Sequence, residues 1–195
     1  MTLKKLFFWF WSTLLIGAVA GLGLAFIMAL FQGEEVVGSI TKQILMGLTL
    51  AAVAQLGFFS YLVFNWLSRG LIRNKTTYDI LLIAMVVFIL GSLVALNSSR
   101  YSGVMLWKHL SVSLLIVVVA FIVAWLKSRW TNASAFIPTL FFMIVATVLE
   151  DIPSFSPKGE EVTLLLLLQS VIILLSCNSW QILQLHRLVG KTEKK

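Results

Sequence analysis

Neutral polar side chains inside long apolar stretches are the residues of this sequence with the clearest capacity for specific contacts. The segment "LAAVAQLGFFSYLVFNW", residues 50–66, lies inside the apolar stretch Ile44–Leu67, with Gln55 near the middle of that stretch and Asn65 near its end. A glutamine amide offers four hydrogen-bonding positions and finds no water in hydrocarbon. We therefore predict that Gln55 faces protein, whereas Asn65 lies close enough to the end of its stretch to reach water.

A second set of polar residues lies near the end of the chain. Ser170, Cys177, Gln181 and Gln184 have the spacing of a single stripe along a helix, and Asn178 lies on the flank of that stripe. The simplest interpretation is hydrogen bonding between helices of one bundle, at about 0.6–2 kcal/mol per bond. The alternative is contact with a helix of a partner protein. Within the bundle, we predict that Gln55 bonds to the Cys177–Gln181 region.

Small residues near Gln55 support a close helix–helix contact. Gly47, Ala51, Ala54 and Gly57 surround it in sequence. Small side chains allow the backbones of two membrane helices to approach closely.

Residue patterns typical of membrane enzymes are absent from the sequence. There is no Gly-x-Ser-Gly motif of the rhomboid-like type, and Asp79 and Asp151 lie at the edges of apolar stretches rather than inside them. The pairs Glu34-Glu35 and Glu160-Glu161 lack the arginine that a CAAX-type protease motif requires. We therefore predict a protein that is not an enzyme.

Metal and cofactor chemistry is also poorly supported by composition. The chain has one cysteine and two histidines, His109 and His186, far apart in sequence. No spacing of Cys and His indicates a metal site, and no cofactor is expected. The acidic residues near positions 34 and 160 supply only hard oxygen ligands, and we do not expect a catalytic metal there.

Composition indicates an integral membrane protein. Of 195 residues, 59% are hydrophobic and only 12% are charged, against about 25% charged in a soluble domain. The net charge of +7 is not arranged as a basic run interleaved with aromatic residues, so nucleic acid is not an expected partner. We predict one domain, residues 1–195, without a separate soluble domain.

Six apolar blocks predict an all-α, polytopic bundle of six transmembrane helices in a lipid bilayer. The third and fifth blocks are shorter than the roughly 20 residues that a span needs. The blocks are Leu6–Phe31, Ile44–Leu67, Ile80–Leu96, Leu106–Leu126, Ala135–Leu149 and Val162–Leu185.

The distribution of basic residues predicts the orientation. With both termini in the cytoplasm, 11 of the 15 basic residues lie inside. All seven tryptophans lie near predicted span ends, where the indole ring prefers the headgroup level. Lys4-Lys5 and the "AVA" at 18–20 are also compatible with a cleavable signal peptide, but the apolar run continues to Phe31, which favours a retained first span.

Two functions from different classes remain open at this point. The absence of ionisable residues from the middle of the apolar blocks, and of broken helices, argues against a transporter. Pro138, which follows the expected helix cap Ser134, is interpreted as a proline at a helix start. A regulatory adaptor is favoured, and a small transporter or channel-like sensor with a ligand among Gln55, Asn178 and Gln181 is the alternative.

Several segments resemble a known family. They are "QLGFFSYL" at 55–62, "FIPTLFFM" at 136–143 leading to Glu150, and Cys177-Asn178 with "LHRL" at 185–188. These segments, with the chain length and six blocks, resemble the KinB-signalling-pathway activation proteins, the KbaA family, of spore-forming Gram-positive bacteria.

The resemblance implies a multi-pass protein of the cytoplasmic membrane that promotes sporulation. Such a protein would support the activation of a membrane sensor histidine kinase that feeds the phosphorelay. The kinase, and also a small lipoprotein, are the partners that the resemblance implies. It implies no catalytic residue.

Overall fold

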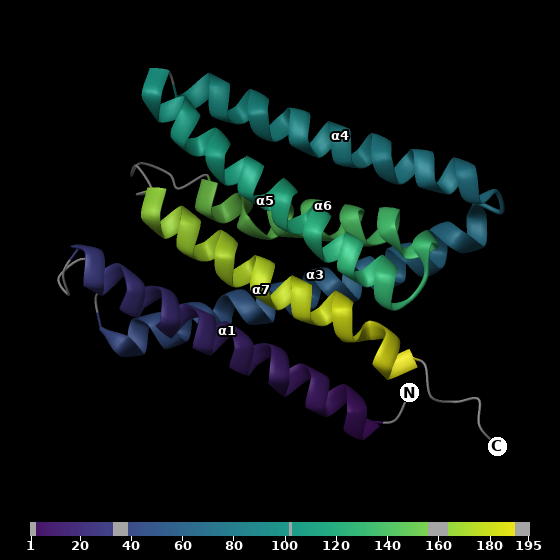
Figure 1. Ribbon diagram of the computed structural model, residues 1–195, viewed down its shortest axis with the longest axis horizontal. Helices are drawn as coiled ribbons and strands as arrows, with labels where there is room; N and C mark the ends of the chain where they lie inside the picture. Colours follow the sequence, from purple (N-terminus) through teal and green to yellow (C-terminus); the bar gives the residue numbers. More distant parts are fainter. Residues whose placement is uncertain (1–2, 33–38, 102, 156–163, 190–195) are drawn as a thin grey trace.

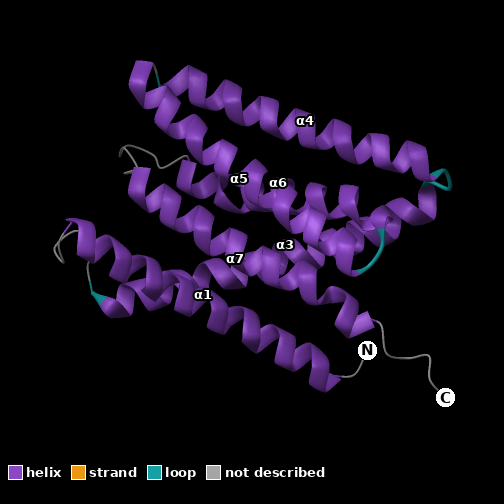
Figure 2. Ribbon diagram, viewed as in Figure 1, coloured by secondary structure: helices purple, strands orange, loops and turns teal. Residues whose placement is uncertain are grey.

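The computed structural model describes residues 3–32, 39–101, 103–155 and 164–189, and these form six α-helices and one short 3₁₀ turn. The elements are α1 (Leu3–Gln32), α3 (Ile40–Leu71), α4 (Lys75–Arg100), α5 (Gly103–Trp130), the 3₁₀ turn Ala133–Ala135, α6 (Phe136–Phe155) and α7 (Leu164–Val189). Figure 2 shows helices joined by short loops within these ranges. The predicted all-α class with six spans is confirmed.

All six helices are long and apolar enough to cross a membrane. Successive helices run in opposite directions, so that the beginning of α1 and the end of α7 lie at the same end of the bundle (Figure 1). This arrangement agrees with an even number of crossings. The assignment of that end to the cytoplasm remains a prediction from the basic residues.

The helices are longer than the apolar blocks that predicted them. The polar stretch 68–79, expected as a connector, is helical except for residues 72–74. Asn74 ends this short turn, because its side-chain oxygen accepts from the backbone N–H of Thr76 at 2.9 Å and caps α4. Polar residues therefore extend the helices toward water, where charge is no obstacle to a helical backbone.

The start of α6 differs from the expected cap. Asn132, not Ser134, accepts a backbone N–H, that of Ser134, and thereby caps the 3₁₀ turn that leads into α6. Pro138 lies in the first turn of α6, as expected for a proline at a helix start.

Close backbone contact joins α1 to α3. A Cβ added at Gly17 would lie 2.5 Å from the carbonyl oxygen of Gly47 and 2.5 Å from the Cβ of Ala51. A Cβ added at Gly21 would lie 2.9 Å from the carbonyl oxygen of Gln43. The small residues of α3 thus allow the close approach that was predicted, and glycines of α1 supply the other half of the contact.

Aromatic rings fill the space between α1, α3 and α6. Phe58 lies 4.8 Å from Trp9 and 5.4 Å from Phe142, between ring centroids. Tyr61 lies 4.8 Å from Phe142, and Phe64 stacks on Phe141 at 5.4 Å. This cluster forms much of the buried core.

The helices differ in how deeply they are buried. Helix α7 buries the largest share of its apolar span and α4 the smallest. In Figure 1, α4 lies at the edge of the bundle opposite α1, and it packs mainly against α6 and α5.

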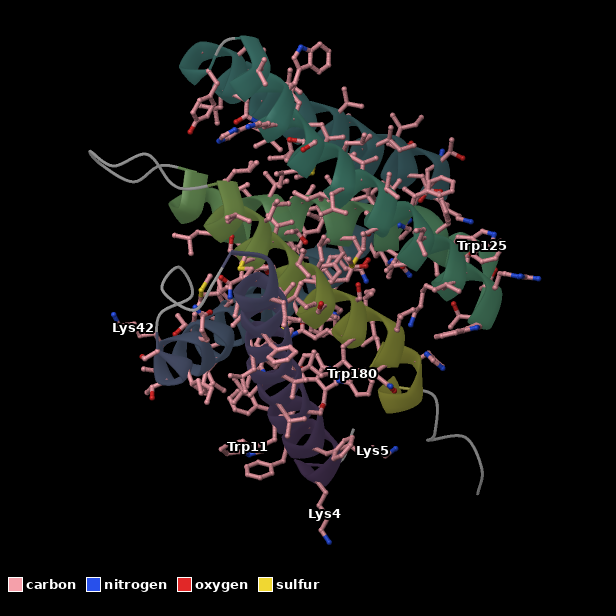
Figure 3. The ribbon with its side chains drawn as sticks, turned by 60° about the vertical axis from the view of Figure 1, so that its left-hand side comes forward. Lys4, Lys5, Trp11, Lys42, Trp125 and Trp180 are labelled. Carbon is pink, nitrogen blue, oxygen red and sulfur yellow. The ribbon has the colours of Figure 1, made fainter. Side chains whose placement is uncertain are left out.

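The tryptophans fall into two groups. Those with exposed rings agree with the predicted position at the headgroup level; they are Trp11, Trp66, Trp107, Trp125 and Trp130. Trp9 is buried in the aromatic cluster, and Trp180 donates from Nε1 to the hydroxyl of Ser12 at 3.1 Å, between α7 and α1 (Figure 3). These two rings stabilise helix packing instead.

Candidate functional site

An acidic residue lies inside the helix bundle, where the sequence had predicted a loop. Helix α6 continues through Glu150 and Asp151 to Phe155, so the prediction that the fifth span ends at Leu149 is wrong. The Glu150 carboxylate contacts Gly57, near the middle of α3, and Asn178, near the middle of α7. An ionisable group therefore lies level with the middles of the apolar helices α3 and α7, whereas the apolar blocks had predicted none there.

The Glu150 carboxylate is held on one side only. Asn178 donates from Nδ2 to Glu150 Oε2 at 2.8 Å, and the same amide lies 3.2 Å from the hydroxyl of Thr147. A Cβ added at Gly57 would overlap Glu150 Oε1, so glycine is what makes room for this oxygen beside α3. Glu150 Oε1 is buried and has no hydrogen-bond partner within the described part of the chain.

A second acidic residue extends the polar contact between α6 and α7. The buried hydroxyl of Ser170 donates to Asp151 Oδ1 at 2.6 Å. One residue before Ser170 on α7, Gln169 donates from Nε2 to Gln43 Oε1 of α3 at 2.6 Å. Polar side chains of α3, α6 and α7 thus meet in the buried interior, where unpaired polar groups are costly.

The groove beside Glu150 has a volume of about 460 Å³. It is lined by residues of α3 and α6 and, from α4, by Met85. Its walls are mostly apolar, and Glu150 is the ionisable carboxylate among them. Walls and rim include Leu56, Ser60, Tyr61, Met85, Val145 and Leu149. Leu56 and Leu149 are exposed on the outside of the bundle, so the groove opens toward lipid.

Gln55 faces the interior as predicted, but its partner differs from the prediction. The side chain is 2% exposed, and Nε2 donates to the backbone carbonyl of Phe10 in α1 at 2.7 Å. Its Oε1 has no partner among the described residues. The predicted contact with the Cys177–Gln181 region of α7 is wrong, because α1 lies against α3 at this level.

The three candidate residues of α7 are all buried but do not form one site with Gln55. Cys177 faces α1, with Sγ 4.0 Å from the carbonyl oxygen of Thr13. Asn178 faces α6 and binds Glu150. Neither amide atom of Gln181 has a hydrogen-bond partner within the described segments. Of the four predicted residues, only Asn178 belongs to the Glu150 site.

A buried cation, Lys127, ties α5 to α7 at the opposite end of α7. Its Nζ donates to the backbone carbonyl of Ile182 at 2.7 Å. The sequence had placed this residue in a connector, but α5 continues to Trp130. Its neighbours are backbone carbonyls, which indicates a packing role.

Sequence reasoning missed Glu150 because a carboxylate was read as the end of a span. The length of the fifth block was the available signal, since Ala135–Leu149 is too short to cross a bilayer unless the helix continues through Glu150. As for metals, no three side chains of His, Cys, Asp or Glu gather as ligands within the residues that the structure describes. The paired acids Glu34-Glu35 and Glu160-Glu161 lie outside those residues.

Six helices long and apolar enough to span a membrane, packed around buried polar side chains, are the architecture typical of multi-pass helical membrane proteins. The chain belongs to the KbaA family, described as KinB-signalling pathway activation in sporulation, whose model matches residues 11–188. It is also 23% identical, over 163 residues, to the KinB-signaling pathway activation protein of Bacillus subtilis (strain 168), with 83% of this chain and 80% of that protein covered. No solved structure matches the chain. Membership links the protein to activation of the KinB pathway in sporulation.

Proposed function

We propose that this protein is a regulator, not an enzyme, that binds a transmembrane helix of a KinB-type sensor histidine kinase and favours the active state of that kinase. The kinase would then feed the phosphorelay. The protein would act in the cell membrane as one six-helix domain, residues 1–195, with both termini in the cytoplasm. A small lipoprotein is a further partner that the family resemblance implies.

The observation that carries this proposal is the Glu150 carboxylate at the end of an apolar groove. An acidic group within a membrane span is costly and is by default a candidate functional group. One of its oxygens is satisfied by Asn178, and the other has no partner within the described residues. A helix in the groove that offers an N–H or O–H donor to Oε1 would lower this cost.

Such binding changes kinase activity only if the two kinase states differ in affinity for the groove. A coupling free energy of about 1–3 kcal/mol corresponds to a change of about 5–150-fold in the equilibrium between states. One charge-assisted hydrogen bond, at about 1.5–3 kcal/mol, has a sufficient magnitude.

The test combines crosslinking with a kinase assay in proteoliposomes that hold the protein and a KinB-type kinase. A photoreactive residue replaces Leu56 at the groove, and in the matched control it replaces Phe121, which is also exposed but lies on α5. We expect crosslinks to the kinase from position 56 and far fewer from position 121. Equal yields at the two positions would contradict docking in the groove.

Glu150→Gln tests the role of the charge. The substitution keeps the side-chain shape and retains an oxygen that Asn178 can contact. We expect at least a fivefold loss in stimulation of kinase autophosphorylation and in crosslinking from position 56, with thermal unfolding of the purified variant unchanged. Full stimulation by the variant would refute the proposal.

A ligand-binding sensor is the second candidate, because the same groove and carboxylate also suit a small molecule. Its volume lies within the usual range for small-molecule sites, about 300–1,000 Å³. The ligand would meet Glu150 rather than the Gln55, Asn178 and Gln181 set expected from the sequence. Stimulation of the kinase in a system reconstituted from purified components alone supports the adaptor. A requirement for an added membrane extract of small molecules supports the sensor.

A further inference from the structure

A cationic hollow of about 280 Å³ lies at the end of the bundle where α1 begins and α7 ends. Arg69 and Arg73 line it from the end of α3 and the following turn, and Lys75 lines it from the first residue of α4. Ser134 and Pro138 line it from the start of α6. The hollow is separate from the groove beside Glu150, since the two share no lining residue.

One wall of the hollow is fixed by side-chain contacts. The hydroxyl of Tyr78 donates to Asn65 Oδ1 at 2.7 Å, and the guanidinium of Arg69 lies over the Tyr78 ring, 5.6 Å from its centroid. Arg69 is exposed, but this contact positions its guanidinium over the first turn of α4. A cation in a defined position loses less side-chain entropy when it binds an anion.

The charge of the hollow favours an anion. Three cationic side chains line it, against the single carboxylate of Asp79. Helix α4 begins at Lys75, and helix α6 begins at Phe136, between the lining residues Ser134 and Pro138, so the amino-terminal ends of two helices lie beside the hollow. Helix amino termini carry partial positive charge and add to the field of the side chains.

The position of the hollow matches the headgroup level of a bilayer. Trp66, one turn before Arg69 on α3, has a side chain that is 78% exposed, and exposed tryptophan is typical of the membrane interface. Leu67 and Leu71 beside it are also exposed on the outside of the bundle. Lipid phosphates lie at this depth, and basic pockets between helices are known to bind anionic headgroups.

We infer that this hollow binds a phosphate group, supplied by the headgroup of an anionic membrane lipid or by a free phosphate compound. The cations of Arg69, Arg73 and Lys75 would bind its oxygens. Arginine suits this role because its planar guanidinium can donate two parallel hydrogen bonds to one phosphate.

The first experiment measures lipid retention by native mass spectrometry of the full chain, released from detergent with equal amounts of phosphatidylglycerol and phosphatidylcholine. We expect the wild-type protein to retain more phosphatidylglycerol than phosphatidylcholine. The variant Arg69→Gln/Arg73→Gln/Lys75→Gln should reduce this preference by at least about fivefold, because each cation near an anionic surface contributes a comparable factor. Because Arg69 also contacts Tyr78, the variant Arg73→Gln/Lys75→Gln, which keeps that contact, is measured in parallel.

The matched control removes three cations from the same end of the bundle but outside the hollow, in the variant Lys4→Gln/Lys5→Gln/Arg129→Gln. Figure 3 shows Lys4 and Lys5 projecting away from the start of α1. Arg129 lies over the ring of Trp125 on α5. The control should keep the preference of the wild type. An equal loss in the control would mean that general surface charge attracts the lipid, and would overturn the inference.

A second experiment distinguishes the two sources of phosphate. Inorganic phosphate is titrated into the protein in lipid-free neutral detergent while the thermal unfolding midpoint is followed. If the protein retains the anionic lipid preferentially and this preference depends on the hollow, the phosphate comes from a lipid headgroup. If there is no lipid preference, but phosphate raises the midpoint of the wild type and not of the hollow variants, the ligand is a free phosphate compound. If the protein shows no lipid preference and phosphate does not raise its unfolding midpoint, the inference is overturned.

Discussion

The contact between α1 and α3 makes a quantitative prediction for Gly17→Ala. The new Cβ would lie 2.5 Å from the carbonyl oxygen of Gly47, whereas ordinary contacts begin near 3.4 Å. One of the two nearest atoms belongs to the backbone of α3, so rotation of a side chain cannot relieve the overlap. Helix α1 must instead move away from α3 by most of an ångström. Overpacking of this kind typically costs about 1–3 kcal/mol.

A matched control lies on the same helix. A Cβ added at Gly23 would have no heavy atom within 4 Å. Both substitutions gain the same helix propensity, about 0.8–1 kcal/mol, so this contribution cancels when the two variants are compared. Gly17→Ala should therefore be about 1–3 kcal/mol less stable than Gly23→Ala.

The assay is equilibrium unfolding of the purified protein in mixed detergent micelles, followed by circular dichroism. Adding Ala51→Gly to Gly17→Ala removes one of the two closest contacts and leaves the Gly47 carbonyl, so partial recovery is expected. Equal stability of Gly17→Ala and Gly23→Ala would show that the backbones of α1 and α3 are not in close contact, and the reasoning would fail.

Three further predictions follow from the interior and the ends of the bundle. Gln55→Leu should change the free energy of unfolding by less than about 1 kcal/mol, because it removes one hydrogen bond to Phe10 but also removes a buried oxygen without a partner; a larger loss in chemical denaturation would refute this. In a Cys177→Ala background, a cysteine at Ser39 should react with an impermeant maleimide in intact protoplasts, and one at Asn132 should not; the reverse pattern would invert the orientation. Replacing the acidic residues of the two Glu-Glu pairs with glutamine should leave sporulation largely intact. These residues are Glu34, Glu35, Glu160 and Glu161. Complete loss of sporulation at normal protein levels would contradict this prediction.

The spans could be predicted from the sequence because hydropathy reports the solvent around each helix. The inward orientation of Gln55 was predictable for the same reason, since a lone amide is costly in lipid. Its partner was not predictable, because the pattern within α3 does not specify which helix lies beside it. Gly17 and Gly21 of α1 form the close contact with α3. The spacing of these two glycines in the sequence indicates a helix-packing face just as the small residues of α3 do.

The candidate site was harder to predict than the spans. A carboxylate normally marks the end of a span, and Glu150 looks like such a marker in the sequence. Its burial depends on two residues distant in sequence: Asn178, which donates a hydrogen bond, and Gly57, which leaves space. Compensation of this kind arises from tertiary structure, so the short fifth block could indicate that the helix continues through Glu150 but not that the carboxylate is buried.

The weak attachment of α4 has a mechanical consequence. This helix contributes Met85 to the lining of the groove, while the Glu150–Asn178 contact joins α6 to α7 on the other side of α6. A lateral shift of α4 would therefore widen the groove without breaking the contact that holds the carboxylate. Because α4 buries a smaller share of its apolar span than any other described helix, membrane thickness and lateral pressure would act on this helix most directly. A change in bilayer thickness that tilts α4 would therefore move Met85 and change the width of the groove.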